Sequence, residues 1–265
     1  MNKIIIDKEE VILEKITKKI NVEVIPRKDI FGITKIIIDV IKSTDLEINS
    51  LFSNTKLDIV INLKDNVILN LYEYKRGEKA KLQYTYNLDE ESNINVFKFS
   101  NLDTIKEMII CNLNGNKSSI SYNFKAISTC KEVYDMIINH NHKNTSSDIK
   151  NNSVCTDDGK VSFQVSSYVD KGIKNCHVNQ TNRIINLNNN KCEIRPNLYI
   201  DEYDVDANHS ALIGGFNGDE LFYLQSRGIR EDDANKLLIK GFLLSDLSNK
   251  KMIKDIEKNI KEYWG

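Results

Sequence analysis

Residues 206–229, DANHSALIGGFNGDELFYLQSRGI, mark the place where one sequence pattern ends and another begins. Before this segment, apolar residues recur at every second position in short runs, which is typical of strands with one buried face. From Gly218 to the end of the chain, apolar residues recur at helical spacing instead. The segment therefore predicts a boundary between a mainly β body and a small α-helical tail.

The alternating runs are short, and most are bounded by Asn, Asp, Gly, Ser or Lys. The abundant asparagines suit turns, because their side chains bond the backbone and tolerate left-handed conformations. Many short strands at fairly regular spacing are compatible with a sandwich, a barrel or a β-solenoid, which periodicity alone does not separate. The clearest alternating positions are Leu57, Ile59, Ile61 and Leu63, then Leu82, Tyr84 and Tyr86, then Phe97 and Phe99, then Ile120, Tyr122 and Phe124.

Two segments of the body interrupt this pattern. Residues 7–20 place Val11, Ile12, Ile16 and Ile20 at roughly helical spacing, which predicts a short amino-terminal helix. Residues 129–141 also have apolar residues at helical spacing, and the polar stretch after them, HNHKNTSSDIKNNS, predicts an exposed loop.

Three helices are expected in the tail. The first covers about residues 219–227, because acidic residues suit its opening turn and Gly228 suits a left-handed stop. The second starts near Arg230, and the third follows a candidate cap at Ser248. The expected apolar faces of these two helices are Ala234, Leu237, Leu238 and Phe242, and then Met252, Ile253, Ile256 and Ile260.

Composition limits the possible partners and compartments. With 37 basic and 38 acidic residues, the chain has no global charge that would favour nucleic acid or an anionic membrane. The apolar run near Met1 is too short for a signal peptide or a membrane span, so we expect a cytoplasmic protein. The 5 cysteines form no CxxC pair, which argues against a disulfide framework and a closed zinc site.

Residues 204–229, DVDANHSALIGGFNGDELFYLQSRGI, together with 231–243, EDDANKLLIKGFL, closely resemble the end of the SufB/SufD family. Members of this family are scaffold subunits of the SUF iron–sulfur cluster assembly system. Residues 179–200, NQTNRIINLNNNKCEIRPNLYI, resemble the preceding coils of the family. The resemblance implies a right-handed parallel β-helix, or solenoid, for residues 31–216. Residues 1–30 would then form an amino-terminal helical or strand segment, and residues 217–265 a helical ATPase-docking region.

The resemblance also implies a transient iron–sulfur cluster that is not tightly bound. His209 matches the family's motif histidine and is the first candidate ligand. The neighbouring family ligands are replaced here by Thr181 and Ser210. Cys192 is a second candidate ligand, since it lies about one coil before His209 and stacked strands are roughly 4.8 Å apart. Cys155, expected in a polar loop, is a candidate sulfur acceptor.

By the same resemblance, the tail docks a SufC-like ABC-type ATPase. The chain has no GxxxxGK[ST] loop to hold nucleotide phosphates, so we expect a non-enzymatic scaffold whose partner hydrolyses ATP. Further expected partners are a second SufB/SufD-type subunit, either a copy or a paralogue, and a sulfur donor system. The candidate ATPase-contacting residues are Leu221, Phe222, Tyr223, Arg227, Gly228, Ile229, Leu237 and Phe242.

Two other interpretations stay open. The chain can be a structural SufD-like partner without its own cluster site, as the residues Thr181 and Ser210 indicate. It can also be a carbohydrate-active β-solenoid, although its carboxylate pairs, Asp157–Asp158 and Asp201–Glu202, are typical of solvated turns. The resemblance leaves undecided whether the subunit is SufB-like or SufD-like and whether a flavin takes part.

Overall fold

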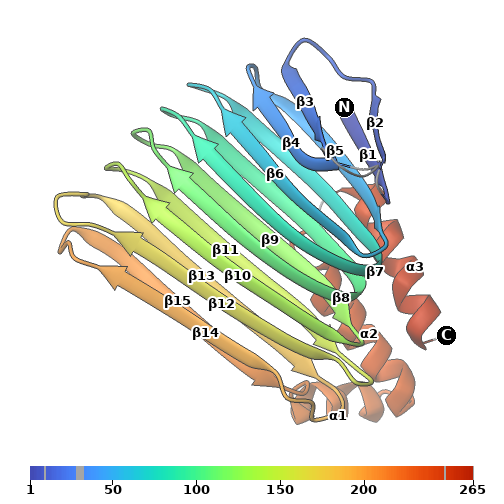
Figure 1. Ribbon diagram of the computed structural model, residues 1–265. Helices are drawn as coiled ribbons and strands as arrows, with labels where there is room; N and C mark the ends of the chain where they lie inside the picture. Colours follow the sequence, from blue (N-terminus) through green and yellow to red (C-terminus); the bar gives the residue numbers. More distant parts are fainter. Residues whose placement is uncertain (9, 28–32, 248, 265) are drawn as a thin grey trace.

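The computed structural model describes residues 1–8, 10–27, 33–247 and 249–264, and within them it shows a β-solenoid followed by three helices. The solenoid has about seven turns. Its strands lie side by side from the amino-terminal end to the carboxy-terminal end, and the helices cover one side of the stack (Figure 1). The solenoid expected from the sequence is confirmed.

Two ladders of parallel strands form the body, and each turn contributes one strand to each ladder. The first ladder contains β1 (Asn2–Asp7), β5 (Thr44–Phe52), β9 (Ser119–Ser128), β11 (Ser146–Cys155), β13 (Cys176–Asn186) and β15 (Val205–Gly214). The second contains β4 (Ile33–Val40), β6 (Thr55–Leu63), β10 (Lys131–His140), β12 (Lys160–Val169) and β14 (Glu193–Ile200). Two long strands, β7 (Ile68–Leu88) and β8 (Asn93–Leu113), pair in both ladders.

The core lies between the two ladders. From β4 and β5 onward, partner residues in successive turns are 23 to 31 positions apart, and side chains of the same kind stack on one another. One such column contains Ile61, Tyr86, Cys111 and Ile138, all fully buried. The alternating apolar positions of β6, β7 and β9 named above are likewise buried, which confirms the strands predicted there.

Many asparagines stack along the outside of the solenoid rather than lying in turns. Asn62, Asn87, Asn112 and Asn139 each donate a side-chain hydrogen bond of 2.8 Å to the residue one turn earlier, and the series starts at Asp39. An amide can donate to one neighbour and accept from the other, so it fits a stack of identical positions. Turns account for others, since five of the eleven described non-glycine residues with positive φ are asparagines.

The predicted amino-terminal helix is wrong. Residues 7–20 instead contain β2 (Glu10–Glu14), which pairs antiparallel with β1, and they end where β3 (Ile20–Pro26) begins. The register sets Ile4 opposite Leu13 and Ile6 opposite Val11. Because β-branched residues pack well on a pleated surface, this pairing outweighs the weak helical spacing. β3 pairs antiparallel with β4, so both added strands extend the amino-terminal end of the solenoid.

The helical spacing in residues 129–141 does not produce a helix either, because residues 131–140 form β10. The polar stretch after it is a turn at residues 141–145, as predicted, but residues 146–153 belong to β11 and not to an exposed loop. Its small polar side chains fit between neighbouring turns, and Ser147, Asn151 and Ser153 are buried. The side chain of Asn151 donates a hydrogen bond of 2.8 Å to the side chain of Asn182 on β13.

The tail contains α1 (Gly218–Ser226), α2 (Glu231–Leu244) and α3 (Lys250–Trp264). Gly228 follows α1 with φ +82, as expected, and Asn249 caps α3 by accepting hydrogen bonds from two backbone amides. The cap predicted at Ser248 lies outside the described residues. Among the described helices, none is long and apolar enough to cross a membrane.

A second apolar core joins the tail to the solenoid. Five strand-derived side chains, one each from β7, β8, β9, β11 and β13, pack against five side chains of α2 and α3. These residues are Tyr74, Phe99, Ile127, Val154 and Ile185, with Ile239, Leu243, Met252, Ile256 and Ile260. The last two helices are therefore anchored across five successive turns.

Candidate functional site

His209 lies near the middle of β15, the last strand of the first ladder, and its side chain is exposed. Among the strands that the structure describes, β15 pairs with β13 alone, in a register that places His209 beside Gln180 and Ser210 beside Thr181. A strand at the edge of a ladder has unpaired backbone groups and is open to pairing with another chain. The histidine is therefore presented at an accessible end of the solenoid.

Cys155 and Cys192 are close neighbours. Cys155 is the last residue of β11 and is buried, whereas Cys192, just before β14, is only partly buried. Their sulfur atoms are 3.3 Å apart, close enough to share a proton. The expectation that Cys155 lies in a polar loop is wrong.

The contact between the two thiols shifts their pKa values in opposite directions. The hydrogen bond between the two sulfur atoms, together with a backbone hydrogen bond at Val161, lowers the pKa of Cys192 to about 6. The same hydrogen bond and burial raise the pKa of Cys155 well above the usual value for a thiol. Cys192 is therefore the more acidic thiol of the pair.

The structure does not bring Cys192 next to His209. In the parallel register, Cys155 is paired with Asn186, while His209 is paired with Gln180. The six-residue offset along β13 corresponds to roughly 20 Å at about 3.3 Å per residue. The two candidate ligands therefore belong to different parts of the solenoid.

The candidate ATPase-contacting residues divide into exposed and packed side chains. No residue of α1 is buried, and Phe222 and Tyr223 are 70% and 57% exposed. Leu237 of α2 is 49% exposed. Phe242 packs against the second apolar core, with the guanidinium of Arg183 5.3 Å from its ring. The remaining members of the set are partly buried or exposed: Leu221 and Ile229 partly buried, Arg227 and Gly228 exposed.

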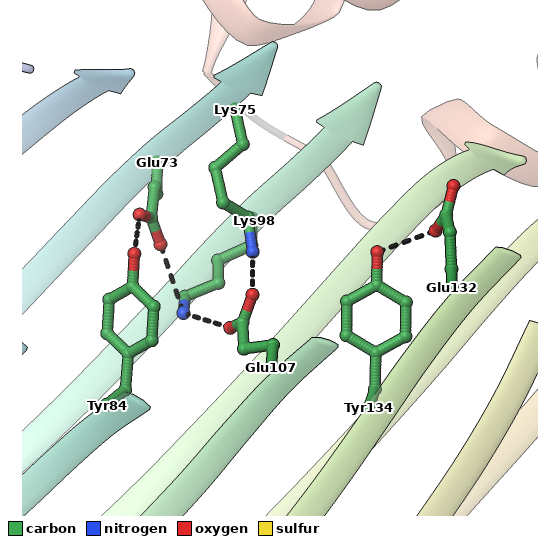
Figure 2. Close-up of polar contacts among 7 residues, drawn as sticks. All are labelled: Glu73, Lys75, Tyr84, Lys98, Glu107, Glu132 and Tyr134. Carbon is green, nitrogen blue, oxygen red and sulfur yellow. Dashed lines mark hydrogen bonds and ion pairs between the residues drawn. The ribbon is translucent and has the colours of Figure 1, made fainter. Parts of the chain in front are cut away.

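A cluster of charged side chains lies fully buried inside the solenoid, and none of its residues is among the site residues predicted from the sequence. Figure 2 shows Lys98 between two carboxylates, 3.0 Å from Glu73 and 2.9 Å from Glu107. Lys75 forms a second ion pair with Glu107, and the hydroxyl of Tyr84 donates to Glu73. Two lysines and two glutamates thus balance one another within the core. A signal was present, because Glu73 and Lys98 are partners in neighbouring turns.

Burial and pairing act in opposite directions on these groups. Burial disfavours the charge on Glu107, but the attraction of Lys75 and Lys98 outweighs it and lowers the pKa of Glu107. Burial opposes the charge on Lys98 too, but Glu107 and Glu73 raise its pKa. For Lys75, burial prevails over Glu107 and lowers the pKa. The lysine that touches both carboxylates is the one held most firmly in its charged form.

A third buried carboxyl group, Glu132 of β10, has no lysine partner in the network that Figure 2 draws. It accepts a hydrogen bond of 2.6 Å from the hydroxyl of Tyr134. Burial raises the pKa of Glu132 to about 8, so the group is protonated at neutral pH.

Within the part of the chain that the structure describes, no three His, Cys, Asp or Glu side chains are grouped as for a metal ion. The three kinds of candidate feature are therefore the exposed His209 on β15, the thiol pair and the exposed side chains of the tail.

Comparison with known proteins identifies the family. Residues 38–242 match the family described as SUF system FeS cluster assembly, SufBD core domain. The iron–sulfur cluster assembly protein SufD of Bacillus subtilis is 30% identical over 113 residues, which cover 40% of this chain and 26% of that protein. An iron–sulfur cluster assembly SufBD family protein of Mycobacterium leprae is 42% identical over 65 residues, which cover 24% of this chain and 17% of that protein.

A third relative, SufD of Escherichia coli, is 38% identical over 50 residues, which cover 19% of this chain and 12% of that protein. The aligned parts thus span about a quarter or less of these relatives. The match to the core domain, by contrast, runs from β4 through most of α2 and so includes nearly all of the solenoid. The chain therefore belongs to the SufBD family of the SUF iron–sulfur cluster assembly system.

Proposed function

We propose that this chain is a non-enzymatic scaffold or partner subunit in iron–sulfur cluster assembly. The observation that carries the proposal is the match to the SufBD core domain over residues 38–242. In the proposed role, the protein works in the cytoplasm, receives sulfur from a donor system and holds a nascent cluster only briefly.

The exposed side chains of the tail support docking of a SufC-like ABC-type ATPase. Phe222 and Tyr223 project from a helix with no buried residue, so their apolar surface is free to be covered by a partner. In this role, α2 and α3 hold the docking helix to the solenoid through the second apolar core.

The open edge of β15 supports pairing with a second SufB/SufD-type subunit, self or paralogue. Leu212 and Ile213 on this strand are exposed, and His209 lies on the same strand. A cluster formed there would be shared between two subunits, so that His209 supplies only part of its ligands. Incomplete ligation suits a scaffold that must release its product.

The alternative function is that of a structural partner without a cluster site of its own. The hydroxyl side chains of Thr181 and Ser210 favour it, because these residues are paired in the strands beside His209 and a hydroxyl is a poorer ligand for iron than a thiolate.

Docking is tested by co-expressing the chain with a SufC-like ATPase and purifying the complex. Replacing both Phe222 and Tyr223 by alanine should release the ATPase. Tyr199→Ala is the matched control, because Tyr199 is also an exposed aromatic residue but lies on β14. Retention of the ATPase by the double variant would refute docking through α1.

Cluster holding is tested by anaerobic reconstitution of that complex with iron and sulfide. The proposal expects visible absorbance that is lost in His209→Ala and kept in His177→Ala, which removes an exposed histidine of the neighbouring strand β13. If the complex gains no absorbance, the structural-partner function is supported instead.

A further inference from the structure

The thiol pair joins two successive turns of the solenoid. Cys155 and Cys192 are 37 positions apart in the sequence, yet their sulfur atoms are 3.3 Å apart. Cys155 ends β11, and Cys192 lies in the segment that connects β13 to β14. β11 and β13 are adjacent parallel strands, so the pair bridges one turn to the next.

Hydrogen bonds fix the segment that carries Cys192. The side chain of Asn190 donates to the backbone oxygen of Asp157 at 2.8 Å, which ties the segment to the turn after β11. Asn186 and Asn190 bond each other through both side chain and backbone, at 2.7 and 3.0 Å. The amide of Cys192 donates to the backbone oxygen of Asn190 at 3.0 Å. The two sulfur atoms are thus held together by contacts that do not involve the thiols.

We propose that Cys155 and Cys192 form a redox-active dithiol, which a low-molecular-weight disulfide oxidises to an intrachain disulfide. A disulfide needs a sulfur–sulfur distance of roughly 2.05 Å, so the side chains must approach by only about 1 Å. The different exposure of the two residues assigns their roles. Cys192 is partly exposed and meets the reagent, while Cys155 is buried beside it.

The reaction proceeds by two thiol–disulfide exchanges. The Cys192 thiolate attacks one sulfur atom of the small disulfide, a mixed disulfide forms at Cys192, and the first small thiolate leaves. Cys155 then loses its proton to solvent and attacks the Cys192 sulfur atom. The mixed disulfide breaks, the Cys155–Cys192 bond forms, and the second small thiolate leaves. Two protein thiols are oxidised and one small disulfide is reduced to two thiols.

The partial exposure of Cys192 supports this order of attack, since the attacking sulfur atom must be accessible to the small disulfide. The inference goes beyond the proposed role in cluster assembly and does not depend on it, because the chain and the oxidant suffice for the reaction. In the oxidised protein, neither sulfur atom is available to iron or to a sulfur donor.

The test exposes the purified, fully reduced chain to oxidised glutathione under native conditions and maps the products by non-reducing peptide mass spectrometry. The expected product is a Cys155–Cys192 cross-link without bound glutathione, with loss of two of the 5 thiols and recovery of both on addition of dithiothreitol. Absence of this cross-link at a large excess of oxidised glutathione would overturn the proposal.

Two variants separate the roles of the thiols. Cys155→Ser should trap glutathione on Cys192, because the second exchange is blocked, and Cys192→Ser should leave Cys155 unmodified. Cys130→Ser is the matched control, since Cys130 is also partly exposed, and it should form the same cross-link as the parent protein. Glutathione trapped on Cys130 but not on Cys192 in the Cys155→Ser variant would refute the assignment. If a variant fails to fold, the peptide map of the parent protein decides the question.

Discussion

Glu132→Gln tests the electrostatics of the solenoid interior, because this one carboxyl group gives a distinct pH signature. Glu132 is fully buried, and burial raises its pKa from an ordinary value of 4.5 to about 8. Between pH 4.5 and pH 8, Glu132 keeps its proton in the folded protein but has released it in the unfolded chain. The stabilising contribution is therefore complete below pH 4.5 and is lost as the pH rises through 8.

The magnitude follows from the separation of the two pKa values. At 1.36 kcal/mol per pKa unit, the separation corresponds to an upper value of roughly 4–5 kcal/mol of unfolding free energy lost between pH 4.5 and pH 8. Glutamine has nearly the same shape, carries no charge at any pH, and can still accept the hydrogen bond from Tyr134. Glu132→Gln should therefore match the parent protein near pH 5 and become more stable than it, by a few kcal/mol, near pH 9.

The assay is denaturant unfolding followed by circular dichroism, for both proteins, at intervals from pH 5 to pH 9. Glu107→Gln is the control, because its effect on the unfolding free energy should change with pH in the opposite direction. Its lysine partners lower the pKa of Glu107, so the ionised carboxylate stabilises the fold above its ordinary pKa and this contribution disappears in acid. Glu107→Gln should destabilise the protein at neutral pH and less so at low pH. A difference between parent and Glu132→Gln that stays constant from pH 5 to pH 9 would refute the reasoning.

Three further substitutions test the buried ion pairs, the asparagine stack and the second apolar core. Lys98→Met leaves two buried carboxylates short of a cation and should cost roughly 3–5 kcal/mol of unfolding free energy, measured by denaturant unfolding at pH 7. Asn87→Ala breaks both hydrogen bonds of this side chain to neighbouring turns and should cost about 1–2 kcal/mol in the same assay; a loss under about 0.3 kcal/mol would contradict a stabilising ladder. Ile256→Ala removes a fully buried side chain from the second apolar core and should cost about 2–5 kcal/mol, with faster amide hydrogen exchange in α3; unchanged exchange there would show that the helix is held by other contacts.

Strict alternation of apolar residues predicted the strands of the body, since inward positions of a solenoid repeat with a period of two. Local spacing of apolar residues indicated the wrong element at residues 7–20 and 129–141. There, apolar residues three to five positions apart fit a helix in isolation, but the segments are strands because a neighbouring strand is available to pair with them. Pairing depends on residues far away in the sequence, which a local window does not contain.

The candidate site was predictable only in part, for a similar reason. Cys155 and Cys192 stood out individually as cysteines, but their contact depends on the path of the connection after β13. The buried charges were hidden because a lysine or glutamate in an alternating run usually faces solvent. Glu73 and Lys98 face inward together, one directly above the other in neighbouring turns, and each makes the burial of the other tolerable. Comparing positions one turn apart is therefore the step that would have located the cluster.

The helices of the tail also differ in how far they depend on contacts with residues distant in the sequence. α2 and α3 contribute buried side chains to a core shared with five turns of the solenoid, so their positions are fixed by the body. α1 contributes no buried residue, although it carries two large aromatic side chains. Exposed aromatic residues on a helix without a buried residue are better explained by a partner than by stability. Changes at Phe222 and Tyr223 should therefore alter binding while leaving the unfolding free energy nearly unchanged, the reverse of what is expected at Ile256.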